Sequence, residues 1–511
     1  MKRRQFLCAT AGTALAASLS KYSAARADDQ KLAPADVTLT NGAKVTLQGA
    51  MLEELRDALH GRLLLPLDDG YDDARRVVNR RIDKHPAFIV QATGAADVGH
   101  AIDFARTNRL LLAVKCGGHN DFGISTCDGG MMLDLSPMRG VRIDAKAKRA
   151  WVSGGTLLGL IDHEAAAQGL IAPLGDQPTV GIGGLATGGG FGRLSRRFGL
   201  TLDTIRSVDV VAADGKLMYA SSTDNPDLFW GIRGGGGNFG VVTNFELELH
   251  SLPTSVVAGT IIFPLAQARQ VLTSYAEYAS KAPDELYVEC FIGVRASKET
   301  SILRLGVCYS GDEASAERVL RALRGFGQVI QDDVRAQSYV AAQGSNRHSD
   351  PRAATSPTTE AYTRAGFVEG IDAGLIAAIV AISEPQPARH LNMLFQPAGG
   401  AIARVANRTT AFAHRSASHD MILATNWLIG ADGPAHLSYS ERVWQALEPH
   451  TRGFYTNDMA GAAAADAIAV NFGENYRRLA ALKSRDDSGN LFKLNANIVL
   501  AAPGVGGGSK Q

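Results

Sequence analysis

The sequence predicts an α+β fold with two domains, and three observations lead to this prediction. The 511 residues are 45% hydrophobic, which allows a large core but more than one folding unit. Between about residues 87 and 250, short apolar runs typical of strands are interspersed with glycine-rich stretches. From about residue 255, β-rich runs alternate with amphipathic helical patterns, which indicates a second α+β domain.

Residues 1–27 have the pattern of an export signal. Lys2, Arg3 and Arg4 precede an apolar stretch, and residues 25–27 provide small residues for cleavage. Residues 3–7 (RRQFL) resemble the twin-arginine signal of proteins that fold before they cross a membrane. The apolar run is shorter than the roughly 20 residues of a spanning helix. We expect a periplasmic or extracellular protein, with an ordinary secretory signal or a membrane anchor as the alternatives.

The charge and cysteine patterns argue against a nucleic-acid partner and against a metal site. Removal of residues 1–27 takes away five basic residues and no acid, so the balance changes from 52 basic against 51 acidic residues to 47 against 51. No basic block interleaved with aromatic residues is present, which argues against a nucleic-acid partner. The cysteines that remain lack metal-ligand spacing, so we expect free buried thiols and no metal site.

The first predicted elements form a β-α-β unit. Residues 87–90 and 111–114 read as strands, and Val98, Ile102 and Ala105 recur between them at helical spacing. The second strand leads directly into a tight turn at residues 116–120, where two glycines are adjacent. Further strands are predicted in the following ranges: 131–135, 150–152, 208–211 and 240–249.

Glycine is concentrated in stretches between these strands, namely residues 117–130, 154–159, 181–192 and 234–240. Glycine lets the backbone come close to a ligand without an intervening side chain, so the clustering indicates an extended ligand. Residues 181–186 (GIGGLA) also fit the dinucleotide pattern of a Rossmann turn. They lack the preceding strand, and three further glycines follow at 188–190, so we reject that interpretation.

Later parts of the chain predict helices and one irregular segment. A helix over residues 265–280 would begin after Pro264, and another covers residues 314–326. Residues 343–357 are polar and irregular, which predicts a surface loop. Leu479, Leu482 and Lys483 predict a further helix, and we expect residues 501–511 to be disordered.

The chain carries a series of motifs in the order 114–120 (VKCGGHN), 134–136 (DLS), 152–155 (VSGG), 178–184 (PTVGIGG), 225–230 (NPDLFW) and 233–243 (RGGGGNFGVVT). Taken together, they resemble the motifs of the vanillyl-alcohol oxidase and p-cresol methylhydroxylase superfamily. The C-terminal pair, residues 472–476 (FGENY) and 490–495 (NLFKLN), is similar to the signature of the berberine bridge enzyme branch.

This resemblance implies a fold and a domain division. A two-lobed FAD-binding domain of the p-cresol methylhydroxylase type would span residues 28–250. A substrate domain, residues 251–455, would place its sheet over the flavin. Residues 456–500 would return to the FAD-binding domain as a C-terminal segment of the berberine bridge type. The activity implied is that of an FAD-dependent oxidoreductase which removes hydride from a small molecule.

The resemblance also assigns cofactor positions. His119 matches the histidine that carries the flavin on its 8α carbon, and a neutral imidazole can add to the quinone-methide form of FAD. Gln177 stands where many members have a second, cysteine link, so we expect a single attachment. Val180 matches the small residue of the oxidases, which favours molecular oxygen as acceptor. The other implied FAD contacts are Lys115, Cys116, Gly117, Gly118, Asn120, Gly123, Ser125, Gly175, Thr179, Gly181, Gly184, Gly189, Gly190, Gly192, Gly240, Val241, Val242 and Asn495.

The catalytic base does not carry over from the family. Asn471 stands at the position of a tyrosine base that several members use, and an amide cannot accept the proton. Tyr455 is our first substitute, and Asp458, Arg404 and His414 are the others. We expect residues 391–395, Arg404 and residues 426–427 near the substrate.

The resemblance is compatible with more than one substrate class and electron acceptor. Family precedents include sugars, aromatic alcohols and secondary metabolites. The alternatives to an oxidase are a dehydrogenase with another acceptor and a flavin-binding protein without turnover. A carbohydrate-binding module without flavin would leave every glycine motif unexplained.

Overall fold

The computed structural model describes residues 31–79, 81–251, 255–344, 359–385, 390–428, 430–459 and 465–500. The export signal, the C-terminal tail and residues 345–357 of the expected loop lie outside the described residues. None of the helices within the described ranges is long and apolar enough to cross a membrane.

The first lobe contains a small sheet in the order β3-β4-β6-β5. Its strands are β3 (Arg62–Leu64), β4 (Phe88–Gln91), β5 (Leu112–Lys115) and β6 (Met131–Asp134). Helix α4 (Ala95–Thr107) connects β4 to β5 and buries Val98, Ile102 and Ala105, as the spacing predicted. β4 and β5 are both parallel to β6, which lies between them, so the predicted β-α-β unit skips one strand.

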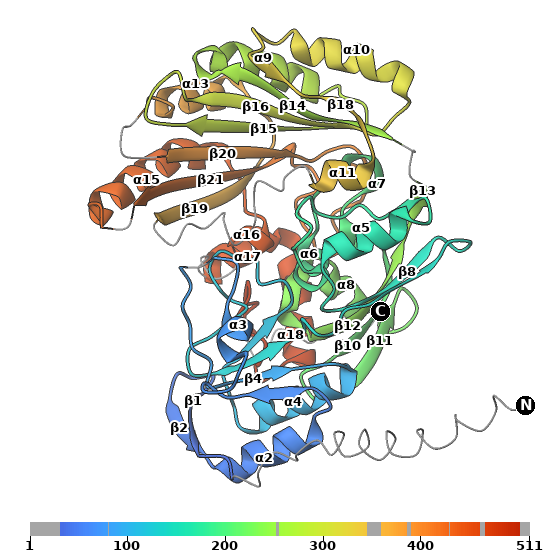
Figure 1. Cartoon of the computed structure of the whole chain (residues 1–511), viewed down its shortest axis with the longest axis vertical. Helices are drawn as coiled ribbons and strands as arrows, with labels where there is room; N and C mark the ends of the chain where they lie inside the picture. The colour runs from blue at the N-terminus through green and yellow to red at the C-terminus, as the bar shows by residue number, and fades with distance from the viewer. Residues whose placement is uncertain are drawn as a thin grey trace, which may run out of the picture.

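The β5-to-β6 connection forms the glycine-rich turn. It joins two neighbouring parallel strands through residues 116–130, and among these described residues it contains no helix. The remaining elements of this lobe are β1 (Ala35–Thr38), β2 (Lys44–Leu47), α2 (Gly49–Ala58) and α3 (Tyr71–Arg75). They pack at the end of the molecule drawn in blue in Figure 1.

The second lobe is built on an antiparallel sheet in the order β11-β10-β12-β8-β7. Its strands are β7 (Val141–Asp144), β8 (Arg149–Ser153), β10 (Ile205–Val211), β11 (Leu217–Ser221) and β12 (Val241–Glu248). The accompanying elements are α5 (Leu158–Ala166), β9 (Leu170–Ile171), α6 (Ile182–Gly188), α7 (Ser195–Phe198), α8 (Pro226–Gly235) and β13 (His250–Ser251).

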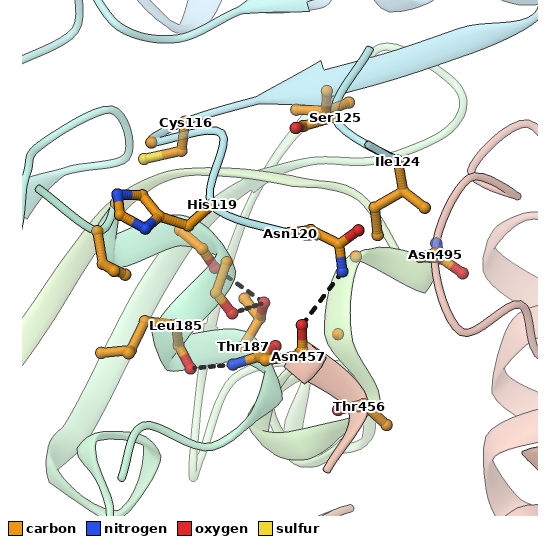
Figure 2. Close-up of a pocket in the computed structure, with 18 of the residues that line it drawn as sticks. Cys116, His119, Asn120, Ile124, Ser125, Leu185, Thr187, Thr456, Asn457 and Asn495 are labelled. Atoms are coloured by element: carbon orange, nitrogen blue, oxygen red, sulfur yellow. Dashed lines mark hydrogen bonds between the residues drawn. The ribbon is translucent and has the colours of Figure 1, made fainter. Parts of the chain in front are cut away.

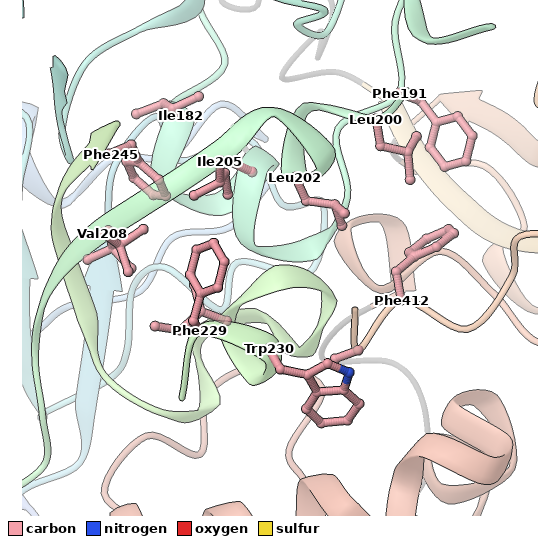
Figure 3. Close-up of a cluster of buried hydrophobic side chains, with 14 of the residues drawn as sticks. Ile182, Phe191, Leu200, Leu202, Ile205, Val208, Phe229, Trp230, Phe245 and Phe412 are labelled. Atoms are coloured by element: carbon pink, nitrogen blue, oxygen red, sulfur yellow. The ribbon is translucent and has the colours of Figure 1, made fainter. Parts of the chain in front are cut away.

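A hydrophobic core holds this second lobe to the rest of the protein. Sheet residues such as Val208 and Phe245 pack with Ile182 of α6 and Phe229 of α8 (Figure 3). Phe412, from the substrate domain, belongs to the same cluster. Burial of large apolar side chains is the main favourable term in folding, so this shared core fixes the second domain against the first.

The second domain is a large antiparallel sheet in the order β17-β14-β16-β15-β20-β21-β19, with β18 also paired to β14. Its strands are β14 (Val256–Pro264), β15 (Leu286–Val294), β16 (Ile302–Tyr309), β17 (Gln331–Asp332), β18 (Arg335–Gln337), β19 (Thr359–Val368), β20 (His390–Pro397) and β21 (His419–Leu428). Its helices are α9 (Ala268–Ala279), α10 (Glu313–Arg324), α11 (Tyr339–Gly344), α13 (Ala373–Ile382), α14 (Ala401–Arg404) and α15 (Gly433–Leu447).

Helices α9, α10, α13 and α15 cover the face of this sheet that points away from the first domain (Figure 1). Helix α10 illustrates why: Asp312 caps its N-terminus by accepting from Ser315 N, and apolar residues at helical spacing face the sheet. The helix predicted over residues 265–280 begins with a 3-10 turn, Leu265–Gln267, before α9. The opposite face of the sheet is free to cover the first domain, as expected.

The C-terminal segment returns to the first domain through α16 (Thr456–Met459), α17 (Ala465–Phe472) and α18 (Tyr476–Asp486). Lys483 of α18 is fully buried, and its ammonium group donates to Asp487 Oδ2 (2.6 Å), Asn238 O (3.0 Å) and Phe492 O (2.9 Å). Asp487 in turn accepts from the backbone N–H groups of Leu491 and Phe492. These bonds fix the segment in place beside the glycine-rich residues that precede β12.

Candidate active site

A cavity of about 410 Å³ lies where the two lobes, the large sheet and the C-terminal segment meet. Three of the four glycine-rich stretches line it, namely those around residues 117–120, 181–184 and 235–240. The stretch at 154–159 lies behind the wall, where Gly154 O accepts a hydrogen bond from Cys116 Sγ (3.1 Å). A cavity whose wall is rich in glycine backbone lets backbone groups come close to a ligand.

Most of the sequence-predicted cofactor residues come together around this cavity. Those that line it are Cys116, Gly117, Gly118, His119, Asn120, Ser125, Gly175, Val180, Gly181, Gly184, Gly240, Val241, Val242 and Asn495. Gln177 and Tyr455 also line it. Segments far apart in the chain therefore contribute to one site, as Figure 2 shows for the His119 loop, α6 and α16.

Six of the sequence-predicted cofactor residues lie outside the lining: Lys115, Gly123, Thr179, Gly189, Gly190 and Gly192. They support the wall from behind. Lys115 Nζ, for example, donates to Ala74 O (2.5 Å) and lies 3.9 Å from Asp134 Oδ1. A Cβ on Gly192 would lie 1.8 Å from Leu174 O, so this glycine permits a close backbone approach.

His119 presents an available imidazole to the cavity. Its Nε2 is buried and has no hydrogen-bond partner among the described residues, while the ring also hydrogen-bonds to the backbone of Thr179. Burial lowers the pKa of His119, and the bond to Thr179 offsets this only in part. The imidazole is therefore neutral at physiological pH, with a free electron pair in the cavity.

Asn457 connects three parts of the wall (Figure 2). Its backbone oxygen accepts from Asn120 Nδ2 (3.1 Å), beside His119. Its side-chain Nδ2 donates to Leu185 O of α6 (3.3 Å) and to the hydroxyl of Tyr455 (2.8 Å). The short helix α16 is thereby tied to the His119 loop and to the glycine-rich helix α6.

Tyr455 reaches the cavity, but its hydroxyl already accepts two hydrogen bonds. Gly190 N donates to it at 2.7 Å, and Asn457 Nδ2 donates at 2.8 Å. Its ring packs edge-on against Phe191, with centroids 5.2 Å apart. Burial raises the pKa of Tyr455 well above its usual value. A phenol in this state keeps its proton at neutral pH and is poorly suited to accept another.

The other proposed substitutes lie in different surroundings. Arg404 is on the surface, 62% exposed, and pairs with Asp284 at 2.6 Å, outside the cavity lining. Asn471 is buried behind the wall, where its Oδ1 accepts from Phe454 N (2.7 Å) and contacts His414 Nε2 (2.8 Å). Asn471 and His414 thus hold the backbone next to Tyr455. Asp458 lines the cavity directly.

The part of the large sheet that reaches the cavity differs from the expected one. Leu391, Met393 and Phe395 of β20 point into the core beneath the outer helices, and Trp427 stacks on His436 of α15 with ring centroids 5.3 Å apart. Because side chains alternate along a strand, the next residue, Gln396, faces the cavity instead. The sequence prediction named residues 391–395, whereas the β20 residue that lines the cavity is Gln396.

The cavity fits a dinucleotide cofactor. A Cβ added to Gly184 or to Gly236 would meet no atom within 4 Å, so both positions leave open space that a ligand can fill. Ser125 Oγ and Asn495 Oδ1 are buried polar atoms without a partner among the described residues. Unpaired buried polar groups are costly, and a ligand with hydroxyl, phosphate or ring nitrogen groups would satisfy them.

Comparison with known proteins agrees with this geometry. Residues 86–221 match the model of the FAD binding domain. The chain is 32% identical over 455 residues to (R)-6-hydroxynicotine oxidase of Paenarthrobacter nicotinovorans, a match that covers 86% of this chain and 97% of that protein. This protein belongs to the berberine bridge enzyme-like FAD-linked oxidoreductases.

Other members of this FAD-linked oxidoreductase family match over most of their length. Berberine bridge enzyme-like 8 of Arabidopsis thaliana is 26% identical, with 81% of this chain and 85% of that protein covered. The solved structure of 6-hydroxy-D-nicotine oxidase from Arthrobacter nicotinovorans superimposes with a TM-score of 0.76 at 30% identity, over 86% of this chain and 98% of the other. The FAD-linked oxidoreductase therefore has the expected two-domain fold.

Proposed function

We propose that this protein is an oxidase that transfers hydride from the carbon of a small alcohol to FAD held covalently by His119. The observation that carries the proposal is the His119 imidazole, which is neutral and unpaired at Nε2 on the cavity wall. FAD, when bound, supplies the hydride acceptor. The residues of the cavity bind and orient it, exclude water and manage the substrate's proton.

A single covalent link follows from the residue at position 177. Gln177 lines the cavity where the resemblance would place a cysteine for a second link. Cys116 also lines the cavity, but its thiol donates to Gly154 O, and burial raises its pKa to about 11. A thiol that stays protonated is a weak nucleophile, so it does not replace the missing cysteine.

Molecular oxygen is the proposed electron acceptor because Val180, a small side chain, lines the cavity. The alternative is a dehydrogenase that uses another acceptor. Solved structures of the same fold include both a wild-type glucose dehydrogenase and a glucose oxidase variant of Phl p 4, at 23% identity, so the fold by itself allows either. Stopped-flow mixing of the reduced protein with air-saturated buffer separates the two, since an oxidase reoxidises rapidly.

The first test is acid denaturation of the purified protein. We expect the yellow flavin to remain with the precipitate and to map to the peptide that contains His119, with none on a cysteine. In His119→Ala the flavin should appear in the supernatant. Flavin release from the wild-type protein would remove the covalent link while leaving FAD binding intact. Bound flavin that no alcohol reduces without oxygen would favour a binding protein without turnover.

We also propose export through the twin-arginine pathway, on the strength of residues 3–7. An N-terminus at Asp28 in the secreted protein is the expected result. Retention of residues 1–27 on a membrane-bound product would contradict it.

A further inference from the structure

Two buried carboxyl groups, those of Asp420 and Asp458, lie next to each other at the cavity wall. Asp420 of β21 is fully buried and lies between Phe367 of β19 and Gln396 of β20 in the sheet register. Gln396 lines the cavity, so this row faces it. Asp458 of α16 lines the cavity from the other side, and the two carboxyl groups lie within hydrogen-bonding reach of each other.

The pair lacks the partners that buried carboxyl groups normally have. Both oxygens of Asp420 and Oδ2 of Asp458 receive no hydrogen bond from any other group in the described part of the chain. Within those same ranges, no Lys, Arg or His is among the charges that act on either residue. A buried carboxylate without a cation or donors is strongly disfavoured, so the pair must share a proton or contact a ligand.

Two carboxylates this close cannot both be ionised at neutral pH. Burial, together with the neighbouring Asp458, raises the pKa of Asp420 far above its usual value. Burial raises the pKa of Asp458 to about 7, and the hydrogen bond from Asp420 acts in the opposite direction. The pair then carries one proton on Asp420, which donates to the Asp458 carboxylate, and the two groups titrate as a unit.

We propose that Asp458, supported by protonated Asp420, is the group that accepts the substrate's hydroxyl proton. The inference rests on the proposed function, in which an alcohol is oxidised to a carbonyl. The C–H bond breaks and its electron pair leaves as hydride to the flavin, which is reduced. The O–H bond breaks, its proton forms a new O–H bond on the Asp458 carboxylate, and a C=O bond forms. Asp458 is the catalytic residue and Asp420 a positioning residue.

The surrounding groups favour Asp458 over the other candidates. Asp458 lines the cavity, and apart from Asp420 no described protein group bonds to its Oδ2, whereas the Tyr455 hydroxyl accepts two hydrogen bonds and keeps its proton. Asn471 is an amide behind the wall. A base with a pKa near the working pH combines a useful ionised fraction with proton affinity.

The rate of flavin reduction should depend on pH because Asp458 must lose its proton before it can act as the base. Asp458 accepts a proton only when ionised, so the rate of flavin reduction should rise with pH and level off above about 7. The other titratable groups that face the pair are Asp121, whose charge raises the pKa of Asp458, and Tyr455. His414 stacks on Phe367, with centroids 4.4 Å apart, and its Nε2 is engaged by Asn471.

The test measures anaerobic flavin reduction in the holoenzyme by stopped flow, with chitobiose, glucose and benzyl alcohol as probes, between pH 5 and pH 9. Asp458→Asn should slow reduction roughly 100- to 10,000-fold, the range typical of losing a general base. Asp420→Asn keeps a donor to Asp458, so the acid limb of the pH profile, in which the rate of flavin reduction rises with pH, should stay near pH 7. Asp420→Leu removes that donor and should move this rise to higher pH. Asp73→Asn, on an 88% exposed surface carboxylate, is the matched control.

A second measurement does not depend on turnover. Infrared difference spectra of the wild-type protein at neutral pH should contain the carbonyl band of a buried protonated carboxyl group. The band should disappear in Asp420→Asn and persist in Asp73→Asn. Flavin content and the unfolding temperature of each variant show whether it folds.

The outcomes separate the inference from the function on which it rests. An Asp458→Asn protein that is folded and reduced as fast as the wild type overturns the inference alone, as does a wild-type spectrum without the protonated band. Wild-type flavin that dithionite reduces but none of the three alcohols does would count against the proposed function, and against the inference with it.

Discussion

Replacement of the buried Lys483 tests how the C-terminal segment is held. In Lys483→Met the apolar stem is retained, but the ammonium group that bonds to Asp487, Asn238 O and Phe492 O is lost. Removing one partner of a buried ion pair costs about 3–5 kcal/mol because it leaves an uncompensated charge. Asp487 still accepts from two backbone N–H groups, so we expect the lower end, about 3 kcal/mol.

The assay is thermal unfolding of the holoenzyme followed by flavin fluorescence, which reports the opening of the cavity. A loss of about 3 kcal/mol should lower the transition by about 6–12 °C, since 1 kcal/mol corresponds to about 2–4 °C for a domain of 150–250 residues. Lys483→Met combined with Asp487→Asn removes the unpaired charge and should recover part of the loss.

Arg485→Met is the matched control, because Arg485 is 58% exposed and its ion pairs within the described ranges are with Asp486 and Asp227. It should change stability by less than about 1 kcal/mol. If Lys483→Met melts within 2 °C of the wild type, or no lower than Arg485→Met, the buried pair does not hold the segment and the reasoning is refuted.

Three further variants test the wall of the cavity. Gly184→Val places a side chain in the open space of the cavity, so it should lower the ratio of flavin to protein absorbance with little change in unfolding temperature. Gly370→Val is the control: it lies at an exposed position where a Cβ also meets no atom within 4 Å, and it should keep its flavin. Asn471→Leu leaves Phe454 N unpaired and should cost about 1–3 kcal/mol in thermal unfolding; an unchanged transition would contradict this role. Tyr455→Phe removes the acceptor for Gly190 N and should cost a similar amount while the acid limb of flavin reduction stays in place; loss of that limb would instead make Tyr455 the base.

Much of the fold could be predicted because local patterns determine it. The helical spacing of Val98, Ile102 and Ala105 gave α4, and all three residues are buried. The order of the strands could not be obtained in this way. β6 lies between β4 and β5 and pairs with both, and nothing in the periodicity of a strand says which partners it takes.

The candidate site also contains residues that local motifs predict and residues that depend on contacts between distant elements. Motif resemblance located His119 and most of the wall, because contiguous glycine motifs carry that information. Arg404 and Asp420 show that motif resemblance carries no information on contacts between distant segments. Arg404 was named from its chemistry alone and lies on the surface beside Asp284. Asp420 was missed, although an acid directly before the apolar run at residues 421–424 is a sequence signal, because its partner Asp458 approaches from a different element.

The return of the chain end to the first domain determines when the flavin can be bound. Phe492, Leu494 and Asn495 complete the cavity wall, and a ribosome makes them long after the glycine-rich loops that form the rest of it. Domains tend to fold in the order of their synthesis, but this cavity cannot close before these residues have been made. Flavin loading therefore follows the synthesis of the whole second domain, and a protein truncated before α18 should lack a complete site to load.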